Sequence, residues 1–166
     1  MLVAPATGML PKRPRLESSC YTGVQCYFLT FCTDYRHAAF SDAAITTLVT
    51  SQFLRAYVFM PDHAHALVEG TDAASDFESF CHHAKQLTSY AYKQKVGRRL
   101  WQPSYYDRVL RGEDGTWDVV AYIVQNPVRR GLVERWQDYP FTGSGVMTKE
   151  ALAEELAVHP VKAWQP

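Results

Sequence analysis

His63 and His65 are the residues whose types and spacing most directly suggest chemistry. They flank Ala64 in the run His-Ala-His-Ala-Leu-Val-Glu, which has the composition of a β-strand. Alternate side chains of a strand lie on one face, so the two imidazoles converge and can share a metal ion. The motif is short, and an isolated His-x-His pair is more often two structural histidines on a half-buried strand.

Tyr122 and Asn126 form a second candidate pair. They lie four residues apart in a segment, 117–126, that is predicted to be a helix, so they share one face about one turn apart. A phenol oxygen and an amide oxygen can then reach one site. Gln125 is turned by about 100° from Asn126 and is a weaker third ligand. Taken alone, a buried Tyr and an Asn that ends the helix before Pro127 explain the pair better.

Tyr105 and Tyr106 are rival nucleophiles. They lie in a predicted strand, 105–110, where neighbouring side chains point to opposite faces, so only one of them can share the face of the histidines. Both are equally consistent with core or base-stacking aromatics. Asp62 follows Pro61 in a tight turn, and its side chain is expected to cap that turn rather than to bind metal.

The elements that position these residues follow from periodicity and turn signals. Strands are predicted over 21–33, 53–60, 63–69 and 105–110, and helices over 42–52, from Ser75 or Asp76 to about Val96, over 117–126 and over the amphipathic stretch 149–158. This order predicts an α+β ferredoxin-like sandwich, a four-stranded antiparallel sheet with helices packed on one face. The expected organisation is a flexible basic arm at 1–20, one catalytic domain at 21–145 and a C-terminal tail at 146–166.

Composition excludes several classes of protein. The chain has 166 residues, of which 47% are apolar and 20% charged, as in an ordinary globular domain rather than a disordered one. The sequence contains no membrane-length apolar run and no recognisable signal peptide, so a cytoplasmic protein is expected. The net charge is zero, yet residues 85–135 hold ten Lys and Arg against five Asp and Glu. Such a local excess is typical of a phosphate-binding face, although a solvated charged surface has the same composition.

Three linked blocks resemble a known family. Ala-Tyr-Val-Phe-Met-Pro-Asp-His-Ala-His-Ala-Leu-Val-Glu (56–69) resembles the strand hairpin of the HUH single-strand DNA transposases. Trp-Gln-Pro-Ser-Tyr-Tyr-Asp-Arg-Val-Leu-Arg (101–111) and Tyr-Ile-Val-Gln-Asn-Pro-Val-Arg-Arg-Gly-Leu-Val (122–133) resemble the next two blocks of the REP-associated tyrosine transposase branch. Tyr-Phe-Leu-Thr-Phe-Cys-Thr (27–33) resembles its first strand, so the match covers about residues 21–145 in order. The segment from Asp42 to Tyr57 is shorter than in the family.

The resemblance implies a role for each matching residue. His63 and His65 match the metal-binding pair, with both rings expected at an exposed strand position, Tyr122 matches the nucleophile, and Asn126 matches the third ligand. The implied activity is a DNA strand transferase that cleaves and rejoins single-stranded, hairpin-containing DNA through a 5′-phosphotyrosine intermediate. Mg²⁺ or Mn²⁺ is the expected cofactor, since an amide oxygen and substrate oxygens suit these ions better than zinc.

The expected partner is single-stranded DNA, a hairpin from a repetitive palindromic element, with no membrane involved and with the chain a monomer or a homodimer. Phosphate contacts are expected from Arg108, Arg111, Arg129 and Arg130, and base stacking from Tyr105 or Tyr106. Two other functions stay open. One is a non-catalytic nucleic-acid-binding module or relic of such a transposase, which the short 42–57 segment favours. The other is a metal-dependent phosphodiesterase that uses water, with Tyr122 structural.

Overall fold

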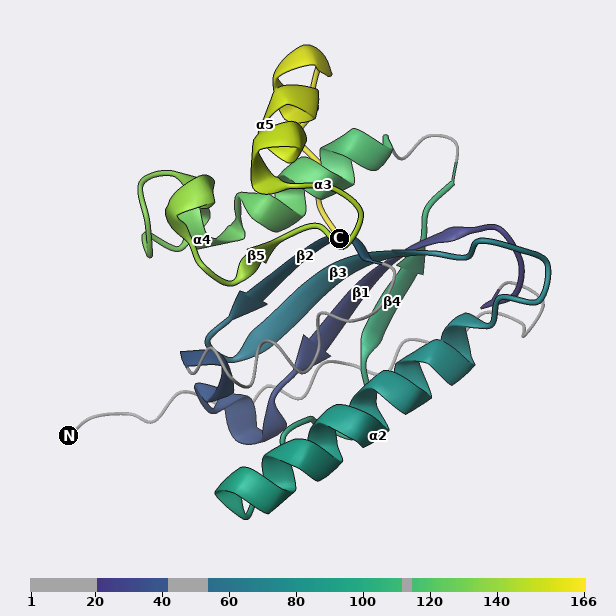
Figure 1. Cartoon of the computed structure of the whole chain (residues 1–166), viewed down its shortest axis with the longest axis vertical. Coiled ribbons are helices and arrows are strands. Elements are labelled where there is room, and N and C mark those ends of the chain that lie inside the picture. The colour runs from purple at the N-terminus through teal and green to yellow at the C-terminus, as the bar shows by residue number, and fades with distance from the viewer. Residues whose placement is uncertain (1–20, 42–53, 112–114) are drawn as a thin grey trace.

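The computed structural model describes residues 21–41, 54–111 and 115–166, and these form an antiparallel sheet with helices on both faces (Figure 1). The strands are β1 (Cys26–Cys32), β2 (Leu54–Met60), β3 (His63–Glu69), β4 (Tyr106–Val109) and β5 (Thr142–Gly143). Their order in the sheet is β4-β1-β3-β2-β5. The predicted arm, 1–20, and the predicted helix, 42–52, lie outside the described residues.

The β2–β3 hairpin is the element that sequence predicted most closely. Met60 pairs with His63 across the Pro61-Asp62 turn, and Val58 pairs with His65. β1 lies between β3 and β4, so that Thr30 stands opposite His65 on one side and opposite Tyr106 on the other. The register therefore brings residues from three segments of the chain next to the histidine pair.

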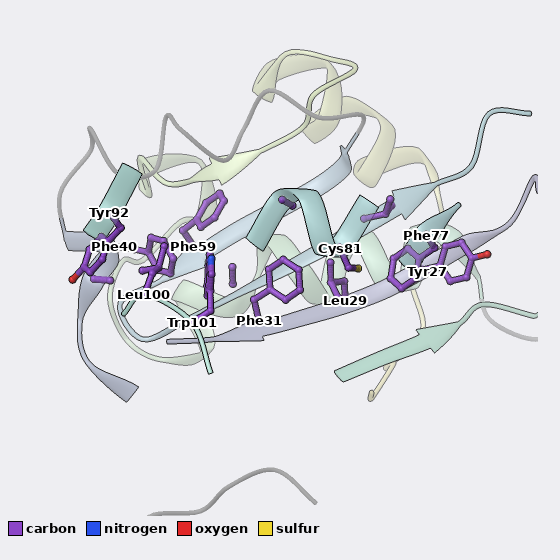
Figure 2. Packing of buried hydrophobic residues seen from close by; sticks show 14 of the residues in the cluster. Tyr27, Leu29, Phe31, Phe40, Phe59, Phe77, Cys81, Tyr92, Leu100 and Trp101 are labelled. Atoms are coloured by element: carbon purple, nitrogen blue, oxygen red, sulfur yellow. The ribbon is translucent and has the colours of Figure 1, made fainter. Parts of the chain in front are cut away.

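Helix α2 (Phe77–Val96) covers one face of the sheet. Asp76 caps its start by accepting a hydrogen bond from the Ser79 backbone N–H at 3.0 Å. Gly97 ends it in the left-handed conformation at φ 79°, which glycine adopts without steric cost. Figure 2 shows the core that α2 closes, with Tyr27, Leu29 and Phe31 of β1 lying in one row with residues of the helix.

The opposite face is covered by helices α3 (Thr116–Val124) and α5 (Lys149–Val158), with the short helix α4 (Asn126–Arg129) following α3. Phe28, Val58 and Leu67, which alternate with the residues under α2, form this second core together with residues of α3. The α+β antiparallel fold is confirmed, but two details differ. The sheet has five strands rather than four, and helices lie on both faces because β1 is apolar on both sides.

Residues 146–166, predicted as a tail, pack onto this second core. Leu152 of α5 is fully buried there. We expect Leu152→Ala to lower the free energy of unfolding by about 2–5 kcal/mol, because it leaves a cavity. Chemical denaturation measures this, with Glu154→Ala, at an exposed position of the same helix, as the control that should change stability by no more than about 0.5 kcal/mol. An unfolding midpoint for Leu152→Ala equal to that of the wild type would mean that α5 does not stabilise the core.

No helix in the described part of the chain is both long enough and apolar enough to cross a membrane.

Candidate active site

His63 and His65 lie on the sheet face that α3 covers. Their ring centroids are 4.8 Å apart with the rings steeply inclined, so the strand does bring the two imidazoles together. They are 6% and 7% exposed, which corrects the expectation of an exposed strand position. The reason is tertiary, because α3 lies over the strand face that the histidines share with Leu67.

Each imidazole is oriented through its Nδ1 atom. The Nδ1 of His65 is 2.8 Å from the hydroxyl of Thr30, and the Nδ1 of His63 is 2.6 Å from the carboxylate of Asp62. A ring held through Nδ1 leaves Nε2 as the atom that can present a lone pair to a metal ion, the usual arrangement in metal sites. The Asp62 carboxylate contacts His63, an arrangement that sequence reasoning missed because it expected the side chain to cap the turn.

The charges around the pair favour a neutral His65. Burial lowers its pKa well below the usual value, and the electrostatic influence of the neighbouring His63 and Arg129 lowers it further. The neutral imidazole is the form that binds metal. At Asp62, burial alone would raise the carboxyl pKa, but the hydrogen bond with His63 and the electrostatic influence of His63 and Arg36 hold it below its usual value. Asp62 is therefore ionised and can accept a hydrogen bond from His63.

Tyr122 reaches the histidines from the second half of α3. Its ring centroid lies 5.8 Å from that of His65 and 5.8 Å from that of Phe28. Arg129 holds the tyrosine from the other side, with its guanidinium carbon 4.2 Å from the ring centroid and its Nη2 donating to the Tyr122 carbonyl at 2.7 Å. Tyr122, His65 and Arg129 thus form one contiguous group. Through this group, α3 places Tyr122 next to the histidine pair of β3.

Asn126 begins α4, one turn after Tyr122, with Pro127 in the first turn. It is 5% exposed, and its amide nitrogen has no hydrogen-bond partner within the described residues. A buried polar group without a partner is costly, and such a group often marks a ligand site. A carboxamide has an oxygen and an NH₂ of similar size, so a half-turn of the side chain exchanges them.

Two imidazoles and an amide oxygen are side-chain groups that could hold a divalent cation. Within residues 21–41, 54–111 and 115–166, no group of three or more His, Cys, Asp or Glu side chains could hold a metal ion. A third protein ligand therefore has to come from a neutral oxygen, and the unpartnered amide of Asn126 is the buried candidate. Two imidazole nitrogens with one amide oxygen leave several coordination positions for substrate oxygens, as Mg²⁺ and Mn²⁺ chemistry requires.

The two candidate tyrosines at the start of β4 point to opposite faces of the sheet, as expected for consecutive residues of an extended chain. Tyr106 lies on the face of the histidines, with its ring centroid 6.3 Å from that of Phe28. Tyr105 lies on the other face against Phe31, Phe77 and Lys85. The fold therefore brings Tyr106 toward the candidate site and places Tyr105 in the core under α2.

The four candidate phosphate-binding arginines lie in two places, two at the end of α4 and two on or just after β4. Arg129 ends α4 and Arg130 follows it, and both residues are exposed. Arg108 extends from β4 on the histidine face, where its strand position is paired with Phe28. Arg111 is exposed just beyond β4. Arg108, Arg129 and Arg130 can thus line the approach to the histidine pair.

Trp164 is a residue of this site that sequence reasoning missed. Its ring centroid lies 4.9 Å from Phe28 and 5.2 Å from Tyr122, and the Arg108 guanidinium carbon is 5.3 Å from its centroid. The Gln165 carbonyl accepts a hydrogen bond from Arg108 at 3.0 Å, and the Lys162 backbone N–H donates to Asp118 of α3 at 2.6 Å. No local pattern in residues 159–166 predicts this placement, because all of its partners are distant in sequence.

The chain is similar to known proteins in sequence and in fold. No protein-family model matches the chain. The curated REP-associated tyrosine transposase of Escherichia coli (strain K12) is 29% identical over 89 residues, 54% of this chain and 52% of that protein. The chain thus matches about half the length of that relative. A solved structure of a REP-associated tyrosine transposase bound to a REP hairpin superposes with a TM-score of 0.62 at 22% identity, over 95% of this chain and 92% of the other. At this identity the superposition shows the shared fold.

Proposed function

We propose that this chain, whose resemblance to the REP-associated tyrosine transposases is confirmed by the two comparisons, cleaves and rejoins single-stranded DNA through Tyr122. One observation carries the proposal. The phenol ring of Tyr122 packs beside His65, whose neutral imidazole belongs to a buried pair oriented through Nδ1. A nucleophile next to two imidazoles that could hold a metal ion is what phosphoryl transfer from DNA to a protein side chain requires.

His63, His65 and Asn126 would hold the divalent ion. When bound, such an ion supplies positive charge to a nonbridging phosphate oxygen and orients the phosphorus. The remaining chemistry belongs to the chain. The Tyr122 oxygen loses its proton and forms a bond to phosphorus, the bond from phosphorus to the 3′ oxygen breaks, and that oxygen takes up a proton and leaves as a free 3′-OH. A 5′-phosphotyrosine remains, and attack by a second 3′-OH restores the phosphodiester and frees Tyr122.

The position of Tyr122 supports this reaction better than hydrolysis. Arg129 contacts both the ring and the carbonyl of Tyr122, so the side chain is held in one place before any substrate arrives. Holding a nucleophile beside the reacting phosphate removes much of the entropic cost of the encounter. A tyrosine with only a structural role in a water-using phosphodiesterase would not need to be held in place by Arg129.

The proposed substrate is a DNA hairpin with a single-stranded flank. The solved relative is bound to a REP hairpin, and the basic residues here suit a similar partner. Arg129 and Arg130 lie on the exposed side of α4, and Tyr106 lies on the site face of β4. Arginines neutralise phosphates and an aromatic ring stacks an unpaired base, a combination suited to single strands.

Covalent capture tests the proposal directly. The full chain is incubated with labelled single-stranded hairpin DNA and Mn²⁺, and the products are separated on a denaturing gel. A labelled band that stays with the protein supports tyrosine transfer. Cleaved DNA without such a band would indicate a water-using phosphodiesterase, and bound but uncut DNA would indicate a non-catalytic binding module.

The arginines of α4 provide a separate prediction for binding. Arg129→Ala with Arg130→Ala should weaken the binding of every single-stranded sequence and reduce the salt dependence. The slope of log K against log salt concentration should fall by about 0.7 for each phosphate that the variant no longer neutralises. Fluorescence anisotropy at several salt concentrations measures the slope.

Arg135→Ala is the matched control, since Arg135 is also exposed and pairs with Asp138 rather than with the site. It should leave the slope unchanged. Arg130→Ala alone separates phosphate binding from the support that Arg129 gives to Tyr122. A double variant with the wild-type slope would place the DNA on another surface.

A further inference from the structure

The short turn Asp34–Arg36 after β1 has an unusual backbone. Tyr35 has φ 50° and Arg36 has φ 56°, and all other positive φ angles in the described residues belong to glycines. A non-glycine residue in the left-handed region is sterically disfavoured, so two in succession persist only where the surroundings hold them. The turn is therefore a place where the fold maintains an unfavourable backbone, and its side chains indicate why.

Contacts from two directions hold this turn. The Thr33 backbone N–H donates to the Asp62 carbonyl at 3.0 Å, which ties the turn to the β2–β3 hairpin, and the Thr33 hydroxyl lies between the carbonyls of Asp62 and His37, at 2.9 and 2.8 Å. On the other side, the Asp34 N–H donates to the Leu100 carbonyl at 2.7 Å, and the His37 ring nitrogen Nε2 lies 3.0 Å from the Tyr92 hydroxyl of α2. The conformation is thus determined by the hairpin and the end of α2 together.

The result of this conformation is the placement of the Arg36 guanidinium. Its Nε is 2.8 Å from one carboxylate oxygen of Asp62, and its Nη1 is 2.8 Å from the Cys32 sulfur. The other carboxylate oxygen of Asp62 contacts His63 Nδ1 at 2.6 Å. The Arg36 side chain is 42% exposed, and ion pairs with that exposure contribute little to stability. The strain in the turn is therefore better explained by an effect of the ion pair on His63 than by a gain in stability from the pair.

We propose that Arg36 is a positioning residue that acts through Asp62 on His63. With one oxygen held by Arg36, the carboxylate cannot turn freely, and its second oxygen stays directed at His63 Nδ1. That keeps the proton on Nδ1 and leaves the Nε2 lone pair toward the metal site. The inference rests on the proposed metal site, and it adds the residue that sets the tautomer and direction of one ligand. Removing such an outer partner weakens metal binding by about 10- to 100-fold.

Metal binding by the whole chain, without DNA, tests the inference. Mn²⁺ titration by calorimetry should show about 10- to 100-fold weaker binding for Arg36→Ala and for Asp62→Ala. Arg36→Lys should recover most of the affinity, because an ammonium group can still pair with Asp62. In the metal-free wild type, nitrogen NMR of His63 should show a single tautomer protonated at Nδ1. Arg36→Ala should show a mixture, which a merely structural role would not produce.

The chain offers a matched control at the far end of the same hairpin. Arg55 pairs with Glu69 and is 43% exposed, but it has no contact with either histidine. Arg55→Ala should leave Mn²⁺ affinity and the His63 tautomer unchanged.

The outcomes separate the two proposals. If Arg36→Ala binds Mn²⁺ as tightly as the wild type, the positioning role is overturned. If the wild type binds no Mn²⁺, the proposed metal site fails, and the NMR spectra of the metal-free proteins decide alone whether Arg36 orients His63. Should Arg36→Ala not fold, Arg36→Gln, which keeps a long polar side chain without the charge, takes its place and is expected to bind Mn²⁺ more weakly than the wild type; wild-type affinity in that variant would overturn the positioning role.

Discussion

Tyr122→Phe is expected to abolish the covalent protein–DNA adduct and to leave DNA binding in place. The change removes only the hydroxyl, while the ring that contacts His65, Phe28 and Trp164 remains. Stability should change by no more than about 1 kcal/mol, the scale of one hydrogen bond. A denaturing gel measures the adduct, and anisotropy with the same labelled hairpin measures binding.

Two neighbouring tyrosines are the controls for this substitution. Tyr106→Phe alters a ring on the same sheet face, and Tyr105→Phe alters one in the core under α2. Both should keep the adduct. Mass spectrometry of the trapped peptide identifies the attachment site. A 5′-phosphonucleotide on a peptide with residues 105–106 would contradict the assignment of Tyr122, and one on a peptide with residue 122 would support it.

His63→Ala with His65→Ala should reduce cleavage by about 10²-fold or more, the scale for losing a group that stabilises charge in the transition state. Because both rings are buried, the double variant should also be less stable, which an exposed strand position would not have implied. His65→Ala leaves the Thr30 hydroxyl without its contact, and an unsatisfied buried hydroxyl costs about 1–3 kcal/mol. Cleavage is therefore measured well below the unfolding temperature of the variant.

Leu67→Ala separates lost stability from lost metal binding. Leu67 lies two residues beyond His65 on the same strand and face, and it is fully buried. Its removal should lower stability by about 2–5 kcal/mol and leave both imidazoles in place. We expect this variant to cut DNA at a temperature where it is folded. A double alanine variant that cuts at the wild-type rate would contradict the metal assignment.

The elements that the sequence predicted well are those specified by local signals. The hairpin around Pro61-Asp62 places His63 and His65 on one face, as strand alternation requires. Asp76 and Gly97 bound α2 as a cap and a left-handed stop. The helix that carries Tyr122 was likewise predicted from spacing, over 117–126, although it ends at Val124 and Asn126 begins the short helix α4.

What tertiary structure decided was the environment of those residues. Thr30 meets His65 across 35 residues of sequence because β1 pairs with β3 in one register. Arg36 reaches Asp62 because the hairpin and α2 hold a backbone that its own residues disfavour. Trp164 packs on Tyr122 only once α3 and the C-terminal residues share a sheet face. Composition and spacing report which side chains a segment presents, whereas burial, ring orientation and the partner of each nitrogen depend on contacts between distant segments, which no local pattern encodes.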